Sequence, residues 1–211
     1  MNKYFDFSID AASTLMPTTS NEKWQNVDEG GLIQENKFDS VQSDLKFLLQ
    51  YKFNNNHRLA IGPNHNLFSM KRHTYSYDGQ PLTGENYGLS QEDVAILNMM
   101  FGYIYEYAPF SNDGMRIKLG ALYGKPIWNK ATNTAAKEIE FSSTKGFTAD
   151  IDGYVGFELM KGLEAGFFGR YSLKKKTDPD AISSSTDIIW PENELETFRY
   201  GVSFVWNFDV K

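Results

Sequence analysis

The sequence predicts an all-β protein, an eight-stranded antiparallel up-and-down barrel. Apolar and polar residues alternate over most of the chain, whereas helical periodicity is scarce. Eight segments alternate in this way: residues 4–12, 44–53, 58–72, 94–107, 115–125, 146–159, 163–173 and 198–211. Their connections are alternately long and short, which places all the long ones at one end of an antiparallel sheet. We therefore expect one barrel domain over residues 1–211.

The first four segments each have two different faces, as strands do. The apolar sets of the first, second and fourth are Phe5, Phe7, Ile9 and Ala11; Leu45, Phe47, Leu49, Tyr51 and Phe53; and Leu97, Met99, Phe101, Tyr103, Tyr105 and Tyr107. The third contains "GPNHN" at residues 62–66, which interrupts the pattern. Because proline cannot donate to a ladder, we expect a bulge there.

The last four segments alternate in the same way. Their apolar sets are Met115, Ile117, Leu119, Ala121 and Tyr123; Phe147, Ala149, Ile151, Val155 and Phe157; Leu163, Ala165, Phe167, Tyr171 and Leu173; and Tyr200, Val202, Phe204, Trp206, Phe208 and Val210. The last set belongs to "YGVSFVWNFDVK", whose other face is small or polar. Each is therefore a two-faced strand.

The connections separate the two ends of the predicted barrel. "NNNH", "APFSNDG" and "MKG" follow the second, fourth and sixth segments and are rich in turn-forming residues. The other connections are about 20 to 30 residues long, which is uncommon in compact soluble domains. An even number of strands with short turns at one end and long loops at the other is typical of an outer-membrane barrel.

Composition excludes several classes of protein. The net charge of −6 argues against a nucleic-acid partner, and the absence of cysteine excludes disulfides and thiol chemistry. No apolar run is long enough for a transmembrane helix. Residues 1–10 lack a basic region followed by an apolar run, so we expect no signal peptide in this chain.

The layout resembles the small eight-stranded outer-membrane barrels of the OmpA, OmpX and OmpW type. The stretch "FRYGVSFVWNF" resembles the aromatic-rich last strand that assembly machinery recognises in such proteins, although "DVK" follows Phe208 here. The resemblance covers the whole chain as a pattern. It implies short turns and both termini at the periplasmic end, long extracellular loops, and residence in a bacterial outer membrane.

Two observations favour lipid on the apolar face. The opposite face mixes charges of both signs with glycines, which suits the crowded interior of a narrow barrel. Aromatic residues gather towards both ends of the strands, such as Phe53, Tyr107 and Trp206 at one end and Trp128 and Phe198 at the other. Such girdles are expected at the two membrane interfaces. The alternative is a soluble lipocalin-like barrel that binds lipid inside.

Charged residues on the inward face predict a closed lumen. The candidate network consists of Arg58, Glu106, Arg116, Lys118, Asp150, Asp152, Glu158, Glu164, Arg170 and Arg199. Unpaired, these charges would be costly to bury, so we expect ion pairs that fill the barrel. Because the fifth and sixth strands are neighbours, we expect "RIK" (residues 116–118) to face "DID" (residues 150–152).

Catalytic and metal sites are not expected. Asp150 and Asp152 could form a carboxylate pair, but a salt-bridge network is the favoured interpretation. His57, His65 and His73 share no metal-ligand spacing and no Ser/His/acid motif. We therefore predict no enzyme, no cofactor and no metal.

Cations and apolar residues near the long loops are candidate contact sites. Lys71, Arg72, Lys125, Lys130, Lys174, Lys175 and Lys176 lie at one level of the barrel. We expect them to contact lipopolysaccharide phosphates, with ordinary solvated rim charges as the alternative. The loops beyond are acidic, and Ile188, Ile189 and Trp190 mark a contact site or strand extensions.

Two functional classes follow for a barrel that is expected to be a monomer. The first is a structural or surface-interaction protein, serving membrane integrity, adhesion or binding of a host or surface ligand through its acidic loops. The second is a narrow pore for ions or small apolar solutes, because apolar side chains point inward from the fourth strand: Val94, Ile96, Met100 and Ile104.

Overall fold

The computed structural model describes residues 4–25, 33–77, 80–81, 91–109, 114–133, 138–141, 146–177 and 192–209. Its strands are β1 (Phe5–Thr14), β2 (Thr18–Gln25), β3 (Ile33–Lys52), β4 (His57–Tyr77), β5 (Gln80–Pro81), β6 (Gln91–Tyr107), β7 (Met115–Asn133), β8 (Glu138–Phe141), β9 (Gly146–Met160), β10 (Leu163–Thr177) and β11 (Glu192–Asp209). Within these ranges no helix is long and apolar enough to cross a membrane.

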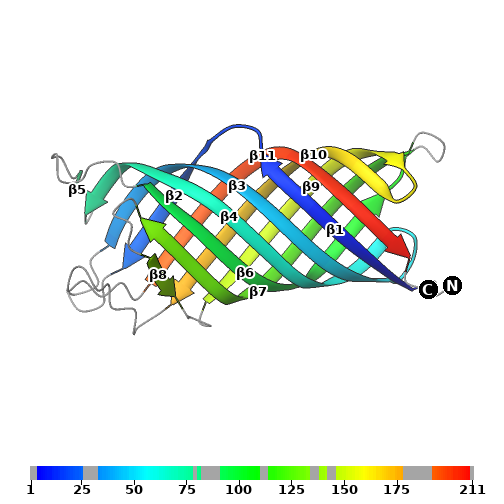
Figure 1. Ribbon diagram of the computed structural model, residues 1–211, viewed down its shortest axis with the longest axis horizontal. Helices are drawn as coiled ribbons and strands as arrows, with labels where there is room; N and C mark the ends of the chain where they lie inside the picture. Colours follow the sequence, from blue (N-terminus) through cyan, green and yellow to red (C-terminus); the bar gives the residue numbers. More distant parts are fainter. Residues whose placement is uncertain are drawn as a thin grey trace.

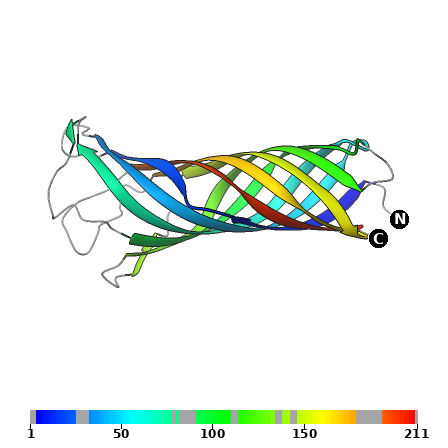
Figure 2. The same ribbon diagram turned by 90° about the horizontal axis from the view of Figure 1, so that it is seen from above.

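The strands close into an eight-stranded antiparallel barrel (Figures 1 and 2). β1 pairs with β3 on one side and with β11 on the other, so that the first and last strands meet. β2 lies between the same two neighbours further along and continues the path of β1. β5 and β8 are short additions to β4 and β7. The predicted fold class is therefore confirmed.

Short turns define one end of the barrel. At the β3–β4 turn, Asn54 Oδ1 accepts hydrogen bonds from the backbone N–H groups of Asn56 and His57, at 2.8 and 3.0 Å. Gly114 and Gly162 have φ values of 66° and 80°, a region in which glycine lacks the steric cost of a Cβ. Asp6 pairs with Asp209 at this end, which agrees with the predicted position of both termini (Figure 1).

The strands extend further towards the other end than the sequence predicted. β3 and β4 have 20 and 21 residues, and β7 has 19. Parts of the expected long loops are therefore strand, including all of β2. β1 ends before Pro17, which lacks an N–H group for the ladder, and β2 starts immediately after it.

The predicted bulge at residues 62–66 is wrong. The β3–β4 register is the same on both sides of this segment, although the ladder has no pairs at Phe47 and Leu48, opposite Pro63 and Gly62. The missing proline N–H thus removes ladder contacts without inserting a residue. A register shift does occur at another strand proline, Pro126, between the pairs Asn98–Pro126 and Leu97–Trp128.

From the short turns, which we call the lower end, up to the level of Val41 and Trp128, the two faces of the barrel differ sharply in polarity. Outward-facing side chains there are apolar and exposed, for example Ile151 at 64% and Phe167 at 67%. Most inward-facing side chains are polar or charged and buried, with Lys46 at 1% and Arg199 at 0%, and two small apolar groups lie among them. We call the outward apolar surface the belt. Exposed aromatic residues mark its two edges: Tyr4, Phe53, Tyr107, Trp206 and Phe208 near the short turns, and Tyr123, Trp128, Tyr171 and Phe198 near the other end.

Beyond the belt the polarity reverses. We call this part the collar; it comprises β2 with residues 33–40, 68–77, 91–96 and 192–196. Its described interior contains one apolar cluster, made of Phe38, Phe68, Met70, Val94, Ile96 and Leu195, beside the buried polar side chains of Thr18, Ser20, Glu22 and Ser40. Its outward side chains are polar or charged: Asn21, Lys23, Glu35, Lys37, Lys71, Asp93 and Glu196. An apolar cluster inside and a polar surface outside is the arrangement that water imposes on a protein surface.

Candidate functional site

Ion pairs close the lumen near the short turns. We call this cluster the lower ring; it consists of Asp6, Lys52, Arg58, Glu106, Arg116, Lys118, Glu158 and Glu164. Arg58 reaches Glu106 at 3.0 Å and Asp6 at 3.2 Å. Lys118 lies 2.7 Å from Glu164. Four acids and four bases leave the ring without net charge, which lowers the cost of burying it.

A second cluster, the central network, crosses the lumen higher up. Arg170 forms ion pairs with Asp44 and Asp152, and Lys46 reaches Asp152 at 2.7 Å. Arg199 Nη2 lies 2.6 Å from Asp44 Oδ2. An amide chain supports the cluster: Asn66 donates to Asp44, Asn98 donates to Asn66 at 3.1 Å, and Thr148 donates to Asn98 at 3.0 Å.

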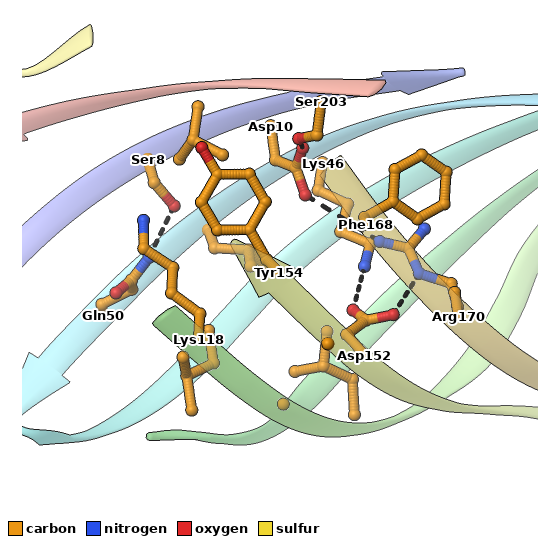
Figure 3. A pocket seen from close by; sticks show the side chains of 16 residues that line it. Ser8, Asp10, Lys46, Gln50, Lys118, Asp152, Tyr154, Phe168, Arg170 and Ser203 are labelled. Atoms are coloured by element: carbon orange, nitrogen blue, oxygen red, sulfur yellow. Dashed lines mark hydrogen bonds and ion pairs between the residues drawn. The ribbon is translucent and has the colours of Figure 1, made fainter. Parts of the chain in front are cut away.

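A small chamber of about 70 Å³ separates these two clusters (Figure 3). Lys118, Gln50 and Ser8 lie at its lower side, and Lys46, Asp152 and Arg170 line it from the central network. Its walls also include two apolar groups that do not merge across the lumen: Leu48, Leu122 and Ile104 on one side, and Tyr154, Phe168 and Val205 on the other.

Three layers therefore block the lumen. The lower ring lies near the short turns, the central network lies above the chamber, and the apolar cluster of the collar lies above both. The side chains of Asn64, Asn98 and Arg199 are completely buried, as in a protein core. The described residues thus form a filled barrel, which is what eight strands allow.

The structure gives all ten predicted network residues a place on the lumen side, with Glu158 exposed at the short-turn rim, but divides them between the two clusters. Six of them belong to the lower ring: Arg58, Glu106, Arg116, Lys118, Glu158 and Glu164. Asp152, Arg170 and Arg199 belong to the central network, and Asp150 accepts a hydrogen bond from Ser172 at 2.7 Å beside it.

The expected contact between "RIK" and "DID" is wrong. The β7–β9 register pairs Arg116 with Gly156 and Lys118 with Tyr154, so these cations lie well below Asp150 and Asp152. Neighbouring strands were predicted correctly, but their relative shift was not. Asp152 is instead bound by Lys46 and Arg170, which come from β3 and β10.

The predicted lipopolysaccharide-contacting cations do not share one face. The prediction of an outward contact is wrong for Lys174. Its side chain is 2% exposed, and its Nζ lies 5.0 Å from the ring centre of Phe68 inside the barrel. Lys71 and Lys125 are exposed on the outer surface, and Lys175 is half-buried there. The side chains of Arg72, Lys130 and Lys176 lie outside the described part, as do residues Ile188, Ile189 and Trp190.

Two members of the central network are absent from the predicted set. Asp44 is the acid that both Arg170 and Arg199 contact, and its side chain is completely buried. Lys46 binds Asp152. The signal was available, because both have the same strand parity as the buried Gln50. Asp44 lies at the first position of the predicted strand, where only the residues that follow it indicate which face its side chain occupies.

Catalytic or metal-binding geometry is not apparent among the described residues. No group of three His, Asp or Glu side chains in these ranges could hold a metal ion. Asp150 and Asp152 do not form a carboxylate pair, because Ser172 binds one and two cations bind the other. His57 lies on the outer surface against Tyr103.

Comparison with known proteins gives structural neighbours only. No protein-family model and no curated protein sequence matches the chain. Among solved structures, the outer membrane protein OprG from Pseudomonas aeruginosa is 14% identical with a TM-score of 0.49, and 99% of this chain and 98% of that chain are covered. Neisserial surface protein A is 12% identical with a TM-score of 0.43, covering 97% of each chain. The attachment invasion locus protein Ail of Yersinia pestis is 14% identical with a TM-score of 0.34, covering 97% of this chain and 100% of that chain.

Proposed function

We propose that this chain is a bacterial outer-membrane barrel with a structural and surface-interaction role. The observation that carries the proposal is the reversal of polarity between the belt and the collar. Lipid is the solvent that suits an apolar exterior over a charged interior, and water is the solvent that suits the collar. The boundary between them marks the outer edge of the hydrocarbon layer.

The filled lumen favours a structural role over transport. Both charged layers contain several buried ion pairs, and the collar adds an apolar layer above them. Opening a path for solutes would require breaking several buried ion pairs at once. Each charge that is left buried without its partner costs free energy. The barrel is therefore best suited to anchoring.

The collar supports a role at the cell surface. β3 and β4 continue through the belt and pair up to Gln34–Tyr77, so a rigid sheet projects beyond the apolar surface. Its exterior displays both signs of charge, including the exposed ion pair between Lys23 and Glu35 at 3.3 Å. A binding partner or neighbouring cell-surface molecule would meet this collar and the acidic segments that it supports.

The first test is heat-dependent gel mobility after refolding in detergent. We expect the unboiled protein to migrate differently from the boiled protein and to precipitate in plain buffer, because the belt needs an apolar environment. A protein that is a soluble monomer in buffer, with no mobility shift, would contradict the proposal and favour the lipocalin-like alternative.

A narrow pore is the second candidate, and the chamber is the observation that favours it. It lies between two charged layers and already provides part of a path. In planar bilayers we expect only brief, small events from the wild-type barrel. Steady conductance that increases when Arg170→Ala shortens a side chain lining the chamber would support the pore instead.

We also propose that the outer surface of the barrel binds lipopolysaccharide phosphate through Lys71, Lys125 and Lys175. Lys71 pairs in register with Asp39, and Lys175 pairs with Glu194, whereas Lys125 stands opposite Met99. Lys125 at the edge of the belt is therefore the strongest of the three candidates.

Neutralising these three lysines to glutamine should abolish the gain in thermal stability that lipopolysaccharide gives the refolded barrel, with Lys125→Gln producing the largest single loss. Lys23→Gln is the matched control, because Lys23 is exposed but lies higher in the collar and pairs with Glu35. An unchanged gain in the triple variant would contradict this contact.

A further inference from the structure

A group of buried polar side chains lies between the central network and the apolar cluster of the collar. It comprises Thr18, Ser20, Gln42, Lys174, Thr197 and Arg199, and we call it the upper patch. Each is at least nine-tenths buried. Each also has a side-chain nitrogen or oxygen with no hydrogen-bond partner among the described residues. A concentration of such atoms in one place requires an explanation, because most buried polar groups are paired.

Strand register brings these residues together. Ser172 pairs with Thr197 and Lys174 with Leu195 across β10 and β11. On the other side of β11, Glu196 pairs with Asn21 of β2, next to Ser20. Thr18 pairs with Ser40 of β3, two residues from Gln42. The upper patch is therefore one continuous interior surface formed by four neighbouring strands.

Two cations in this patch lack sufficient carboxylate partners. The Lys174 ammonium lies 5.0 Å from the ring centre of Phe68 and has no hydrogen-bond partner among the described residues, although Asp150 and Asp44 attract it from a longer distance. Arg199 reaches Asp44 through Nη2, while its Nε and Nη1 have no hydrogen-bond partner in the described part of the chain. Asp44 already receives Arg170 and Asn66, so it cannot serve both cations fully. Buried N–H donors left in this state cost several times a typical hydrogen bond.

The unpaired atoms are mainly donors. Lysine and arginine nitrogens can only donate, and the three hydroxyl groups can all turn to donate. Gln42 Oε1 is the one obligate acceptor of the patch itself, and Asp150 Oδ2, on the strand beside Ser172, is a second buried acceptor without a hydrogen-bond partner in the described part. Water molecules would bring further hydrogens that need acceptors, whereas a small anion accepts from several donors and offsets the two positive charges.

We propose that the upper patch binds a small inorganic anion, between a halide and a phosphate in size, held by Lys174, Arg199 and the surrounding hydroxyl groups. The anion would act as a structural ligand of the barrel interior. This proposal does not depend on what the collar or the outer surface binds.

Thermal unfolding in detergent free of lipopolysaccharide tests the proposal. The probes are sodium chloride and sodium phosphate, each compared with sodium gluconate at equal ionic strength, since gluconate is larger than the anion proposed. We expect chloride or phosphate to raise the midpoint of thermal unfolding relative to gluconate. At an anion concentration one hundred times the dissociation constant, the unfolding midpoint should rise by about 5–10 °C in a chain of this size.

Variants decide between a bound anion and trapped water. Lys174→Met should lose the anion-specific shift, whereas Lys175→Met, the outward-facing neighbour on the same strand, should keep it. If Lys174→Met does not fold, Thr197→Val replaces it. This variant removes one hydroxyl donor and should weaken the anion-specific shift of the unfolding midpoint. Equal midpoints in chloride, phosphate and gluconate would overturn the proposal and indicate water alone. An unchanged shift in the inward-facing variants would overturn it as well.

Anomalous diffraction from crystals grown in bromide tests independently whether a halide occupies the upper patch. An anomalous peak within hydrogen-bonding distance of Lys174 Nζ is the expected result. A well-defined patch that contains no such peak would contradict a halide, and the same experiment with arsenate would then decide for or against an oxyanion.

Discussion

Asp44→Asn should be the most destabilising conservative substitution in the lumen. Asp44 contacts both Arg170 and Arg199, and its side chain is completely buried. Asparagine keeps the shape but removes the charge that compensates these two cations. Breaking a buried ion pair from one side typically costs about 3–5 kcal/mol, and we expect a loss of that size in the free energy of unfolding. Urea unfolding of the barrel in lipid vesicles measures it.

Glu35→Gln is the matched control on the same strand. Glu35 forms an ion pair with Lys23 at 3.3 Å, with both side chains more than half exposed. Exposed pairs of this kind contribute about 0–1 kcal/mol, because water already solvates the charges. If Asp44→Asn costs no more than Glu35→Gln, the central network does not stabilise the barrel in the way described.

A double variant separates lost attraction from uncompensated charge. In the Asp44→Asn background, Arg199→Met removes one of the two cations that Asp44 contacted. We expect part of the lost stability to return, because replacing both partners of a buried pair by neutral groups is often close to neutral. A further loss of stability, additive with the first, would show that Arg199 is held by other contacts.

The strand pattern could be predicted from the sequence because lipid and a narrow lumen impose opposite preferences on alternate residues. The alternation of Phe204, Trp206 and Phe208 with Ser203 and Val205 is one example. The inward facing of the ten predicted network residues followed from it. Lys174 was instead expected at the outer rim, because the run "KKK" hides the parity that it shares with Arg170 and Ser172.

The collar was predicted only in part, because the apolar residues change parity at the edge of the belt. The expected strands 58–72 and 94–107 enter it, but β2 and residues 33–40 were expected to be loop. On β4, Ile61 and Leu67 face outward, whereas Phe68 and Met70 face inward. On β6 the same change separates Met99 from Ile96. A search for continuous alternation therefore ends a strand at the membrane surface, although the ladder continues. The parity change is itself a sequence signal for that surface.

Ion-pair partners could not be predicted, because register is set by the whole closed barrel. Lys118 and Asp152 lie on adjacent strands with complementary charges, yet Lys118 pairs in register with Tyr154. Sequence alternation fixes which face a side chain occupies but leaves shifts by two residues open. The partners across the lumen, such as Lys46 and Asp152, depend on the tilt of all eight strands.

Phe167→Arg should be the most destabilising substitution on the outer surface if the belt is embedded in lipid. Phe167 is 67% exposed and lies near the middle of the belt. Arginine at the midplane of a transmembrane barrel costs about 2–4 kcal/mol, because its charge must leave water. We expect a loss of this size in the free energy of unfolding from lipid vesicles.

Met160→Arg is the depth control. Met160 is 63% exposed, nearly the same as Phe167, but it is the last residue of β9 at the short-turn edge. There arginine can reach the headgroups, and a cost of about 0–1 kcal/mol is expected. Equal costs at both positions would contradict a membrane belt. A Phe167→Arg protein that is more soluble in buffer and no less stable would instead place water on this face, and the charged lumen would then need another explanation.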